Sequence, residues 1–328
     1  MTDTTSLYKK FEKDFKIGAA INHRTMYSAE KLIDQHFNSL TAENEMKFEN
    51  LHPAKDEYVF NTSDEMVKFA RKHNKAMRGH TLIWHNQTSD WIFQKNGKLV
   101  DSITLQNRMK DHIDTVVGRY KGKIYSWDVV NEVISDEKDT FYRNSKWYEI
   151  MGESFIEKAF DYAHKADSEA KLLYNDYNES DPIKRDKIYQ LVNQLKEKHV
   201  PIHGVGMQAH WNIYDPTLDN IRAAIEKYAS LGLEIQITEM DVSMFAHDDK
   251  RTDLTAPTEK MVEFQHERYL KFFEIFKEYS QHIGAVTFWG VADDYTWLDN
   301  FPVRGRKNWP FLFDHNQEPK DVLHKIVK

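Results

Sequence analysis

The stretch Ile124–Glu132 reads IYSWDVVNE, a short run of mostly apolar and aromatic residues that ends in two polar side chains. Runs of this length that are rich in Val, Ile and aromatic residues are typical of buried parallel strands. Seven further runs have the same form: Ile17–Asn22, Leu40–Met46, Ala76–Trp84, Leu172–Asn178, Ile202–His210, Leu233–Asp241 and Ala285–Ala292. The sequence therefore predicts eight strands.

Longer segments with apolar residues at helical spacing separate these runs. They are Ser28–Phe37, Glu65–His73, Leu105–Tyr120, Ser154–Ala166, Ile183–Lys198, Thr217–Leu231 opened by Pro216, Val262–Tyr279, and a last helix opened by Pro319. Eight strand-then-helix units predict an α/β fold, a single (β/α)8 TIM barrel that spans residues 1–328 as one domain. The alternative, an open doubly wound sheet, would need a glycine-rich phosphate turn after Ile17–Asn22, and that turn is missing.

Composition excludes several classes of function. The chain has 328 residues, a net charge of −7 and no cysteine. We expect no nucleic acid and no membrane partner, because both need clustered Lys and Arg or a long apolar span. The lack of cysteine excludes disulfides and thiolate metal sites. The segment Met1–Lys16 has no apolar core of a secretory signal, which predicts a cytoplasmic location.

Polar side chains gather where the predicted strands end. The active sites of barrels lie at the carboxyl ends of their strands, so these side chains are expected to meet at one mouth. Any one of them can be a helix cap or a solvated loop residue, but seven strand ends together favour a functional site. The candidates are Glu43, Asn44, Lys47, His80, Trp84, His85, Asn131, Glu132, Asn175, Asp176, Asn178, Gln208, His210, Glu239, Asp241 and Trp289.

Two of these ends each deliver a glutamate after an apolar run: SWDVVNE ends in Glu132, and EIQITEMD contains Glu239. A pair of carboxylates at one barrel mouth is what glycoside hydrolysis requires. One carboxyl protonates the departing oxygen, and the other attacks the anomeric carbon or activates water. The competing interpretation is a pair of structural carboxylates bonded to Arg or Lys.

A metal site is the main competing chemistry. His80, His85 and His210 could hold a divalent ion together with nearby acids. However, His80 and His85 are five residues apart across a strand end and the following loop, which does not match a helical zinc motif. We therefore expect no metal and no cofactor.

Tryptophans accompany these polar groups. Trp84, Trp289 and Trp297 lie in or just after predicted strands, and each can be an ordinary core residue. The segment FWGVADDYTW, which contains Trp289 and Trp297, mixes acids with aromatics in a way that suits a cleft better than a packed core. Indole faces stack on sugar rings, which is consistent with a carbohydrate substrate.

These segments resemble glycoside hydrolase family 10, the xylanases. TAENEMKFE, GHTLIWH, WDVVNE, QAHW, ITEMD and the tryptophan segment near residue 289 occur in the family's order, and the resemblance runs from Ile17 to the last helix. It implies a retaining endo-1,4-β-xylanase whose substrate is a xylan-derived oligosaccharide. In this resemblance Glu132 is the acid/base and Glu239 is the nucleophile.

The resemblance also implies roles for the other strand-end residues. Asn131 bonds the sugar's 2-hydroxyl, while His210 and Asp241 orient Glu239. Tyr177 and Asn178 touch the leaving-group side. Gln208 and His210 flank the nucleophile. The remaining residues surround the sugars on the other side of the scissile bond: Glu43, Asn44, Lys47, His80, Trp84, His85, Trp289 and Trp297.

One departure and two alternatives remain. After His85 the chain reads NQTSDWIF, where Asn86 and Ser89 replace the family's commoner Ser and Pro, so the conformation of that loop is left open. The lack of a recognisable binding module, together with the ending WLDNFPVRGRKNWPFLFD, resembles the family's intracellular branch, which is thought to process imported xylo-oligosaccharides. The alternatives are a cellulase and a sugar-binding barrel without activity; the latter is disfavoured because both glutamates are present.

Overall fold

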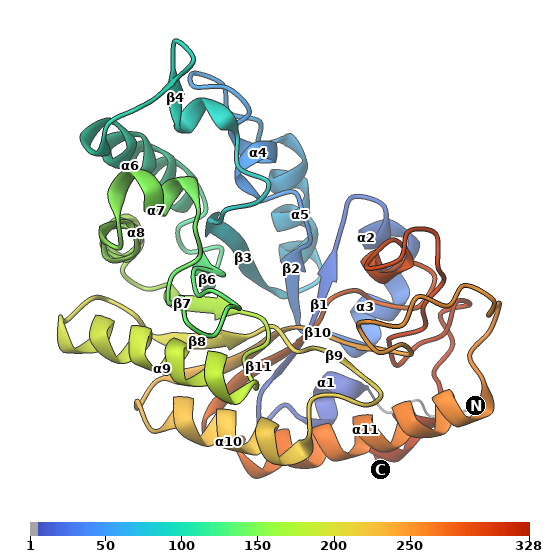
Figure 1. The fold of residues 1–328 in the computed structure, drawn as a ribbon. Coiled ribbons are helices and arrows are strands. Elements are labelled where there is room, and N and C mark those ends of the chain that lie inside the picture. The colour runs from blue at the N-terminus through green and yellow to red at the C-terminus, as the bar shows by residue number, and fades with distance from the viewer. Residues whose placement is uncertain (1–5) are drawn as a thin grey trace.

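Eight parallel strands close into a barrel in this computed structural model, which describes residues 6–328 (Figure 1). Going round the barrel, the order is β11, β1, β2, β3, β6, β7, β8 and β10, and β10 pairs again with β11. The strands are β1 Lys16–Ile21, β2 Ser39–Ala42, β3 Ala76–Ile83, β6 Ser126–Asn131, β7 Lys171–Asp176, β8 Gly204–Met207, β10 Glu234–Ser243 and β11 Ile283–Phe288. The predicted (β/α)8 barrel is confirmed.

Helices alternate with these strands and surround them in Figure 1. The longer ones are α3 Glu30–His36, α5 Asn61–Lys72, α6 Ser102–Arg119, α8 Ser154–Ala166, α9 Pro182–Glu197, α10 Leu218–Ala229 and α11 Glu259–Glu278. The short ones are α1 Leu7–Lys10, α2 Thr25–Ser28, α4 Phe48–Leu51, α7 Lys146–Met151 and α12 Asp321–Ile326. Among residues 6–328, no helix is long and apolar enough to cross a membrane.

Side-chain caps set where several helices begin. Asp101 accepts a hydrogen bond from Thr104 N at the start of α6, and Thr217 accepts one from Asn220 N at the start of α10. Such caps satisfy backbone N–H groups that the first helical turn leaves unpaired. Because Thr217 is the cap, Pro216 precedes α10 instead of opening it. Pro319 likewise lies before α12, which begins at Asp321.

The predicted strand Ile202–His210 is wrong at its carboxyl end, and the difference matters for the site. Strand β8 stops at Met207, and the chain resumes as β9, His210–Asn212, which pairs with β10 alongside Asp241–Ser243. Between the two segments Ala209 has a φ of 58°, in the left-handed region. On either side of this break, Gln208 contacts the carboxyl group of Glu132 and His210 contacts that of Glu239. A small hairpin, β4 Gln94–Lys95 with β5 Lys98–Leu99, was also not predicted.

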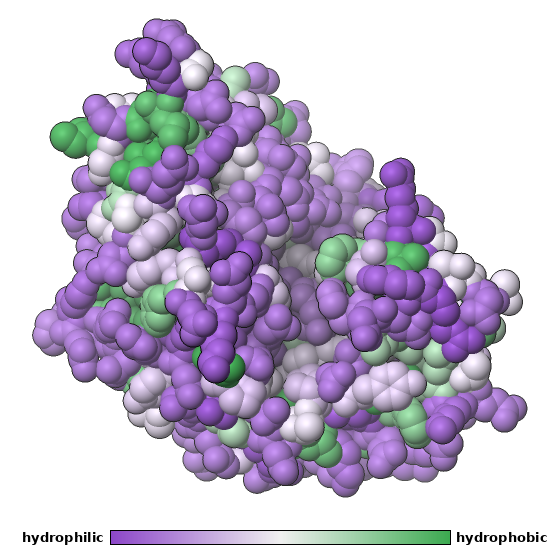
Figure 2. All heavy atoms as spheres, in the orientation of Figure 1, coloured by the Kyte–Doolittle hydropathy of each residue, from purple (hydrophilic) through white to green (hydrophobic). Residues whose placement is uncertain are grey.

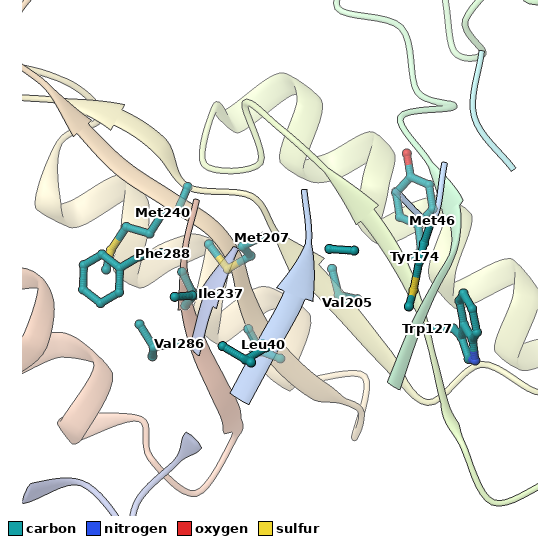
Figure 3. Packing of buried hydrophobic residues seen from close by; sticks show 14 of the residues in the cluster. Leu40, Met46, Trp127, Tyr174, Val205, Met207, Ile237, Met240, Val286 and Phe288 are labelled. Carbon is teal, nitrogen blue, oxygen red and sulfur yellow. The ribbon is translucent and has the colours of Figure 1, made fainter. Parts of the chain in front are cut away.

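The apolar core lies mainly between the barrel and its helices. Side chains alternate between the two faces of a strand, and Leu40, Trp127, Tyr174, Val205 and Val286 are all buried (Figure 3). The inside of the barrel is polar instead. Arg78 of β3 donates to Gln236 of β10 at 2.8 Å, and Asn175 of β7 accepts from Thr238 of β10 at 2.6 Å. Neither pair of strands is adjacent, so these bonds must cross the barrel interior.

Gly79 of β3 has no room for a side chain. A Cβ added there would lie 2.1 Å from Cε3 of Trp127 on the neighbouring strand β6. We expect Gly79→Ala to lower the free energy of unfolding by at least about 1–3 kcal/mol, because overpacking a rigid core forces strands apart. Thermal unfolding followed by circular dichroism measures this change. Gly118→Ala on α6, where nothing lies within 4 Å of the added methyl, is the matched control.

Candidate active site

Glu239 lies near the carboxyl end of β10, where the pairing with β11 is irregular. The register shifts between Ile237 and Met240, and this shift brackets Glu239. Its Oε2 lies 2.8 Å from His210 Nε2, and its Oε1 accepts from Asn175 Nδ2 at 3.1 Å. With only 5% of its surface exposed, the carboxylate is held at both oxygens.

His210 is fixed from its other ring nitrogen. Nδ1 lies 2.9 Å from Asp241 Oδ1, and the second oxygen of Asp241 accepts from Trp297 Nε1 at 2.8 Å. The Trp297 ring also meets the His210 ring edge to face, with centroids 5.0 Å apart. His210, Asp241 and Trp297, all three predicted from the sequence as site residues, therefore form one chain of contacts that ends on Glu239.

These contacts keep Glu239 ionised. Burial by itself would raise the pKa of Glu239, but the charges of His80 and His210, with the hydrogen bond from His210, outweigh it, and the pKa is lowered. Burial likewise opposes the charged form of His210, yet Asp241 and Glu239 together raise the pKa of His210 well above its usual value. An ionised carboxylate beside an imidazolium is well suited to nucleophilic attack.

Glu132 follows directly after β6 and has the opposite tendency. Its Oε2 accepts from Trp84 Nε1 at 2.7 Å and its Oε1 from Gln208 Nε2 at 3.0 Å. Burial is the largest cause that raises the pKa of Glu132, followed by the charge of Asp176; the charge of Glu239 has a smaller effect. The neighbouring charge that raises the pKa of Glu132 most is therefore that of Asp176, not that of the partner glutamate.

Two amides connect the glutamates. Gln208 Nε2 donates to both Glu132 Oε1 and Asn131 Oδ1, and Asn175 Nδ2 donates to both Glu239 Oε1 and Asn131 Oδ1. This orientation gives both amide nitrogens an acceptor in Asn131. A reversed Asn131 amide would place its nitrogen 2.9 Å from Asn175 Nδ2, donor against donor. Asn131 thus fixes the distance between the two carboxyl groups.

His80 connects Glu239 to the barrel interior. Its Nδ1 lies 2.8 Å from Asp128 Oδ2, and its Nε2 lies 3.7 Å from Glu239 Oε1. Ligand atoms of His80, Asp128 and Glu239 lie within 4.8 Å of one another, close enough to suggest a metal site among the described residues. However, the guanidinium of buried Arg78 already binds Asp128 at 2.7 Å and would repel a cation there. His85 and His210, the other histidines considered for a metal, are not part of this group.

Glu43, Asn44 and Lys47 follow β2 on one side of the pair. Lys47 Nζ donates to Asn44 Oδ1 at 2.9 Å and to Gln87 Oε1 at 2.8 Å, and it lies 5.0 Å from the centre of the Trp84 ring. Burial lowers the pKa of Lys47 and raises that of Glu43, which accepts from Asn22 at 3.2 Å. The arrangement presents a dense set of donors and acceptors suited to sugar hydroxyls.

His85 and Tyr177 lie near Glu132, next to Arg143, which also donates to the Glu132 carbonyl. Burial is the main reason that the pKa of His85 falls to about 4, and the charges of Arg143 and Lys184 lower it further. Arg143 Nη2 donates to the Tyr177 hydroxyl at 2.8 Å, and Lys184 Nζ lies 3.7 Å from the centre of the Tyr177 ring. Tyr177 is therefore clamped between two cations.

Aromatic rings surround the pair. Trp289 is 6% exposed and meets His80 edge to face at 5.1 Å, while Trp84 lies between Glu132 and Lys47. Figure 2 shows this face of the molecule hollowed between the lobe that carries α4, α6 and α7 and the lobe that carries α2. The structure thus brings most of the candidate side chains from sequence into one region around the two glutamates. Asn178 instead donates to Asp136 at 3.3 Å, beside Tyr177, which donates to the same carboxylate.

Several residues of the site were missed as site residues by sequence reasoning. Asn175 was noted only as a polar strand end, and Asp128, Arg143 and Gln87 were not singled out. Asp128 offered one signal, a charge in the middle of the apolar run SWDVV, where a buried acid needs a partner. Gln87 belongs to the loop whose conformation was left open; it has a φ of 45° and reaches back to Lys47.

Two buried carboxyls at the mouth of a (β/α)8 barrel, one with a raised and one with a lowered pKa, define a glycoside hydrolase site. Comparison with known proteins identifies the family. The model of glycosyl hydrolase family 10 matches residues 6–328, and the chain belongs to this family.

Several relatives match over nearly their whole length. The chain is 53% identical to endo-1,4-beta-xylanase B of Paenibacillus barcinonensis, with 99% of this chain and 98% of the relative aligned. It is 55% identical to an endo-1,4-beta-xylanase of Geobacillus stearothermophilus, with 98% of each covered. The crystal structure of xylanase XynB from Paenibacillus barcinonensis superimposes with a TM-score of 0.98 at 53% identity, covering 100% of this chain and 99% of that one. A structure in complex with xylotriose, 49% identical, also gives 0.98 and covers 99% and 100%.

Proposed function

We propose that this chain hydrolyses β-1,4 xylosidic bonds in xylan and xylo-oligosaccharides as a retaining endo-1,4-β-xylanase, with Glu132 as acid/base and Glu239 as nucleophile. The observation that carries the assignment of roles is the opposite environment of the two carboxyls. Burial and Asp176 favour protonated Glu132, while His80 and His210 favour ionised Glu239. The relatives that match over almost the whole chain are named endo-1,4-beta-xylanases, which supports the substrate.

The two steps follow from these protonation states. Glu239 attacks the anomeric carbon while Glu132 gives its proton to the departing oxygen, and a glycosyl-enzyme forms. Water then enters on the side of Glu132, which takes a proton from it, and the bond to Glu239 breaks. His210 and Asp241 keep Glu239 aimed, and we expect Asn131 to bond the 2-hydroxyl more strongly as positive charge grows on the ring.

A product profile tests the substrate. Purified protein incubated with xylohexaose should release xylose oligomers, while cellohexaose, whose rings carry an extra hydroxymethyl group, should be cleaved far more slowly. The first product seen by proton NMR should be the β-anomer. Equal rates on both hexasaccharides, or a first-formed α-anomer, would contradict the proposal.

The pH dependence of kcat/KM should be bell-shaped. Activity requires ionised Glu239, so it falls on the acid side as pH drops through the lowered pKa of Glu239. It also requires protonated Glu132, so it falls on the alkaline side as pH rises through the raised pKa of Glu132. In Glu132→Gln the alkaline limb should disappear, because the amide does not titrate. Initial rates from pH 3 to 10 on phenyl β-xylobioside, whose leaving group needs the proton of Glu132, measure both limbs, and an unchanged alkaline limb in the variant would assign it to another group.

We also propose that the protein works in the cytoplasm on short, imported xylo-oligosaccharides, as a single catalytic domain. The support is the segment Trp297–Asp314, WLDNFPVRGRKNWPFLFD, which resembles the intracellular branch of the family. Soluble oligomers of a few xylose units should then have a higher kcat/KM than polymeric xylan. Immunodetection in fractionated cells of the source organism should find the protein in the cytoplasmic fraction. Its recovery from the medium of unlysed cells would reject this location.

A further inference from the structure

Glu132 has an unusual backbone conformation. Its φ is 60°, in the left-handed region that residues with a side chain rarely adopt. Such a conformation persists only when the surrounding structure holds it in place. The direction of the carboxyl group depends on this turn, because φ of Glu132 sets where its Cβ points. The residues that hold the turn therefore decide whether the proton reaches the leaving oxygen.

Four backbone groups of the turn are bound by residues outside it. The N–H of Glu132 donates to Asn175 O at 2.9 Å, and its carbonyl accepts from Arg143 Nε at 2.8 Å. The next two N–H groups, of Val133 and Ile134, both donate to the hydroxyl oxygen of Tyr174, at 3.2 and 3.3 Å. One side chain thus receives two consecutive backbone bonds directly after the left-handed residue.

Tyr174 can accept both bonds because its own proton is used elsewhere. The hydroxyl donates to Asp176 Oδ2, two residues along β7 on the same face of the strand. The other oxygen of Asp176 lies 3.0 Å from Lys184 Nζ and accepts from Tyr177 N at 2.9 Å. Tyr174, Asp176 and Lys184 are all buried, with at most 2% of their surface exposed. The hydroxyl is therefore locked with its lone pairs toward the turn.

We propose that Tyr174 and Asp176 are positioning residues for proton donation. The Tyr174 hydroxyl holds the left-handed turn that aims Glu132 at the leaving-group oxygen, and Asp176 fixes that hydroxyl and places a negative charge behind the acid. This inference rests on the proposed role of Glu132 as the acid/base. The two contributions are separable, because Tyr174 acts through geometry and Asp176 acts through both geometry and charge.

The charge of Asp176 also bears on the pKa of Glu132. After burial, the charge of Asp176 is the next largest cause that raises the pKa of Glu132, ahead of Glu239. Removing this charge should let Glu132 lose its proton at a lower pH. Removing the charge also leaves Lys184 with Asp136 as its remaining carboxylate partner. The positive charge of Lys184 is then less neutralised, which lowers the pKa of Glu132 further.

The test uses Tyr174→Phe and two aryl β-xylobiosides, one with 2,4-dinitrophenol and one with unsubstituted phenol as leaving group. Loss of the hydroxyl leaves the turn without its two bonds and misaims the acid. We expect kcat/KM to fall roughly 10- to 100-fold on the phenyl substrate, which needs protonation, and to change by less than about 2-fold on the dinitrophenyl substrate, which does not. Tyr120→Phe is the matched control: Tyr120 is also buried and also bonded through its hydroxyl, to Ser63 and Asp64, but between the outer helices.

Asp176→Asn is the second variant. With its amide oxygen toward Tyr174 the bond that fixes the hydroxyl is kept and the charge is removed, while the amide nitrogen replaces the oxygen that Lys184 Nζ and Tyr177 N contact. We expect the alkaline limb of kcat/KM to move to lower pH, a change that a merely structural role would not produce. Thermal unfolding shows whether both variants are folded. If Tyr174→Phe does not fold, the pH of the alkaline limb of kcat/KM in Asp176→Asn tests the proposal.

The outcomes separate this inference from the proposed function. Wild-type protein that cleaves neither xylobioside would reject the function itself. Active wild type with equal losses on the two substrates in folded Tyr174→Phe, or an unchanged limb in Asp176→Asn, would overturn only the positioning role.

Discussion

Replacing Glu239 with alanine should lower kcat on xylohexaose by roughly 10⁵-fold, the scale on which enzymes lose activity when a covalent nucleophile is removed. Without the carboxylate no glycosyl-enzyme can form, and the remaining groups can only bind substrate and offer a proton. The fold should survive, because Asn175 and His210 each keep another partner, Asn131 and Asp241. Rates from chromatography of products and a thermal unfolding curve measure both expectations.

Rescue with azide tests whether Glu239 is the nucleophile. In Glu239→Ala a small anion can enter the space left by the carboxylate and attack a dinitrophenyl xylobioside from that face. One inversion gives an α-xylosyl azide, which proton NMR distinguishes from the β form. Glu278→Ala, which removes an exposed glutamate paired with Arg222 on the outer helices, is the control and should keep wild-type rates. Formation of β-azide in Glu239→Ala would contradict the assignment.

Replacing Glu132 with alanine should give a loss that depends on the leaving group. We expect kcat/KM to fall by about 10²–10⁴-fold on xylohexaose and on phenyl xylobioside, since a general acid contributes on this scale. The first step on the dinitrophenyl substrate should be nearly unaffected, because that phenolate leaves without a proton. Burst kinetics should then show the glycosyl-enzyme accumulating, since water has lost its base.

Azide again separates the roles, now with the opposite stereochemistry. In Glu132→Ala it can attack the glycosyl-enzyme from the side that Glu132 occupied. Two inversions give a β-xylosyl azide and a faster second step. A Glu132→Ala protein that is slowed equally on both aryl substrates in the first step would mean that another group donates the proton.

The barrel and the location of the site were predictable from the sequence because both follow from local patterns. Eight apolar runs of strand length must be buried, and polar residues at their carboxyl ends meet at one mouth. The strand predicted at β8 is longer than the observed one, because nothing in IHGVGMQAH signals the left-handed conformation of Ala209 just beyond its end.

What the sequence could not predict depends on register and on contacts across the barrel. Arg78, in AMRGHTLI, looks like a solvent-facing residue, yet it lies fully buried between Asp128 and Gln236 on other strands. The left-handed turn at Glu132 is similarly invisible, because Tyr174 reaches it only through the pairing of β6 with β7. For the same reason, Asp176 appeared as one more polar strand end and not as a neighbour that raises the pKa of Glu132.

The central claim is that Glu239 forms a covalent bond to the sugar while Glu132 handles the proton. An activated 2-deoxy-2-fluoro-β-xylobioside tests it most directly, because fluorine slows both steps while the good leaving group still allows the first. Wild-type protein should gain the mass of one fluoroxylobiosyl group, and peptide mapping should place it on Glu239, within ITEMD. A label on another residue, or no label while the compound inactivates the enzyme, would contradict the account.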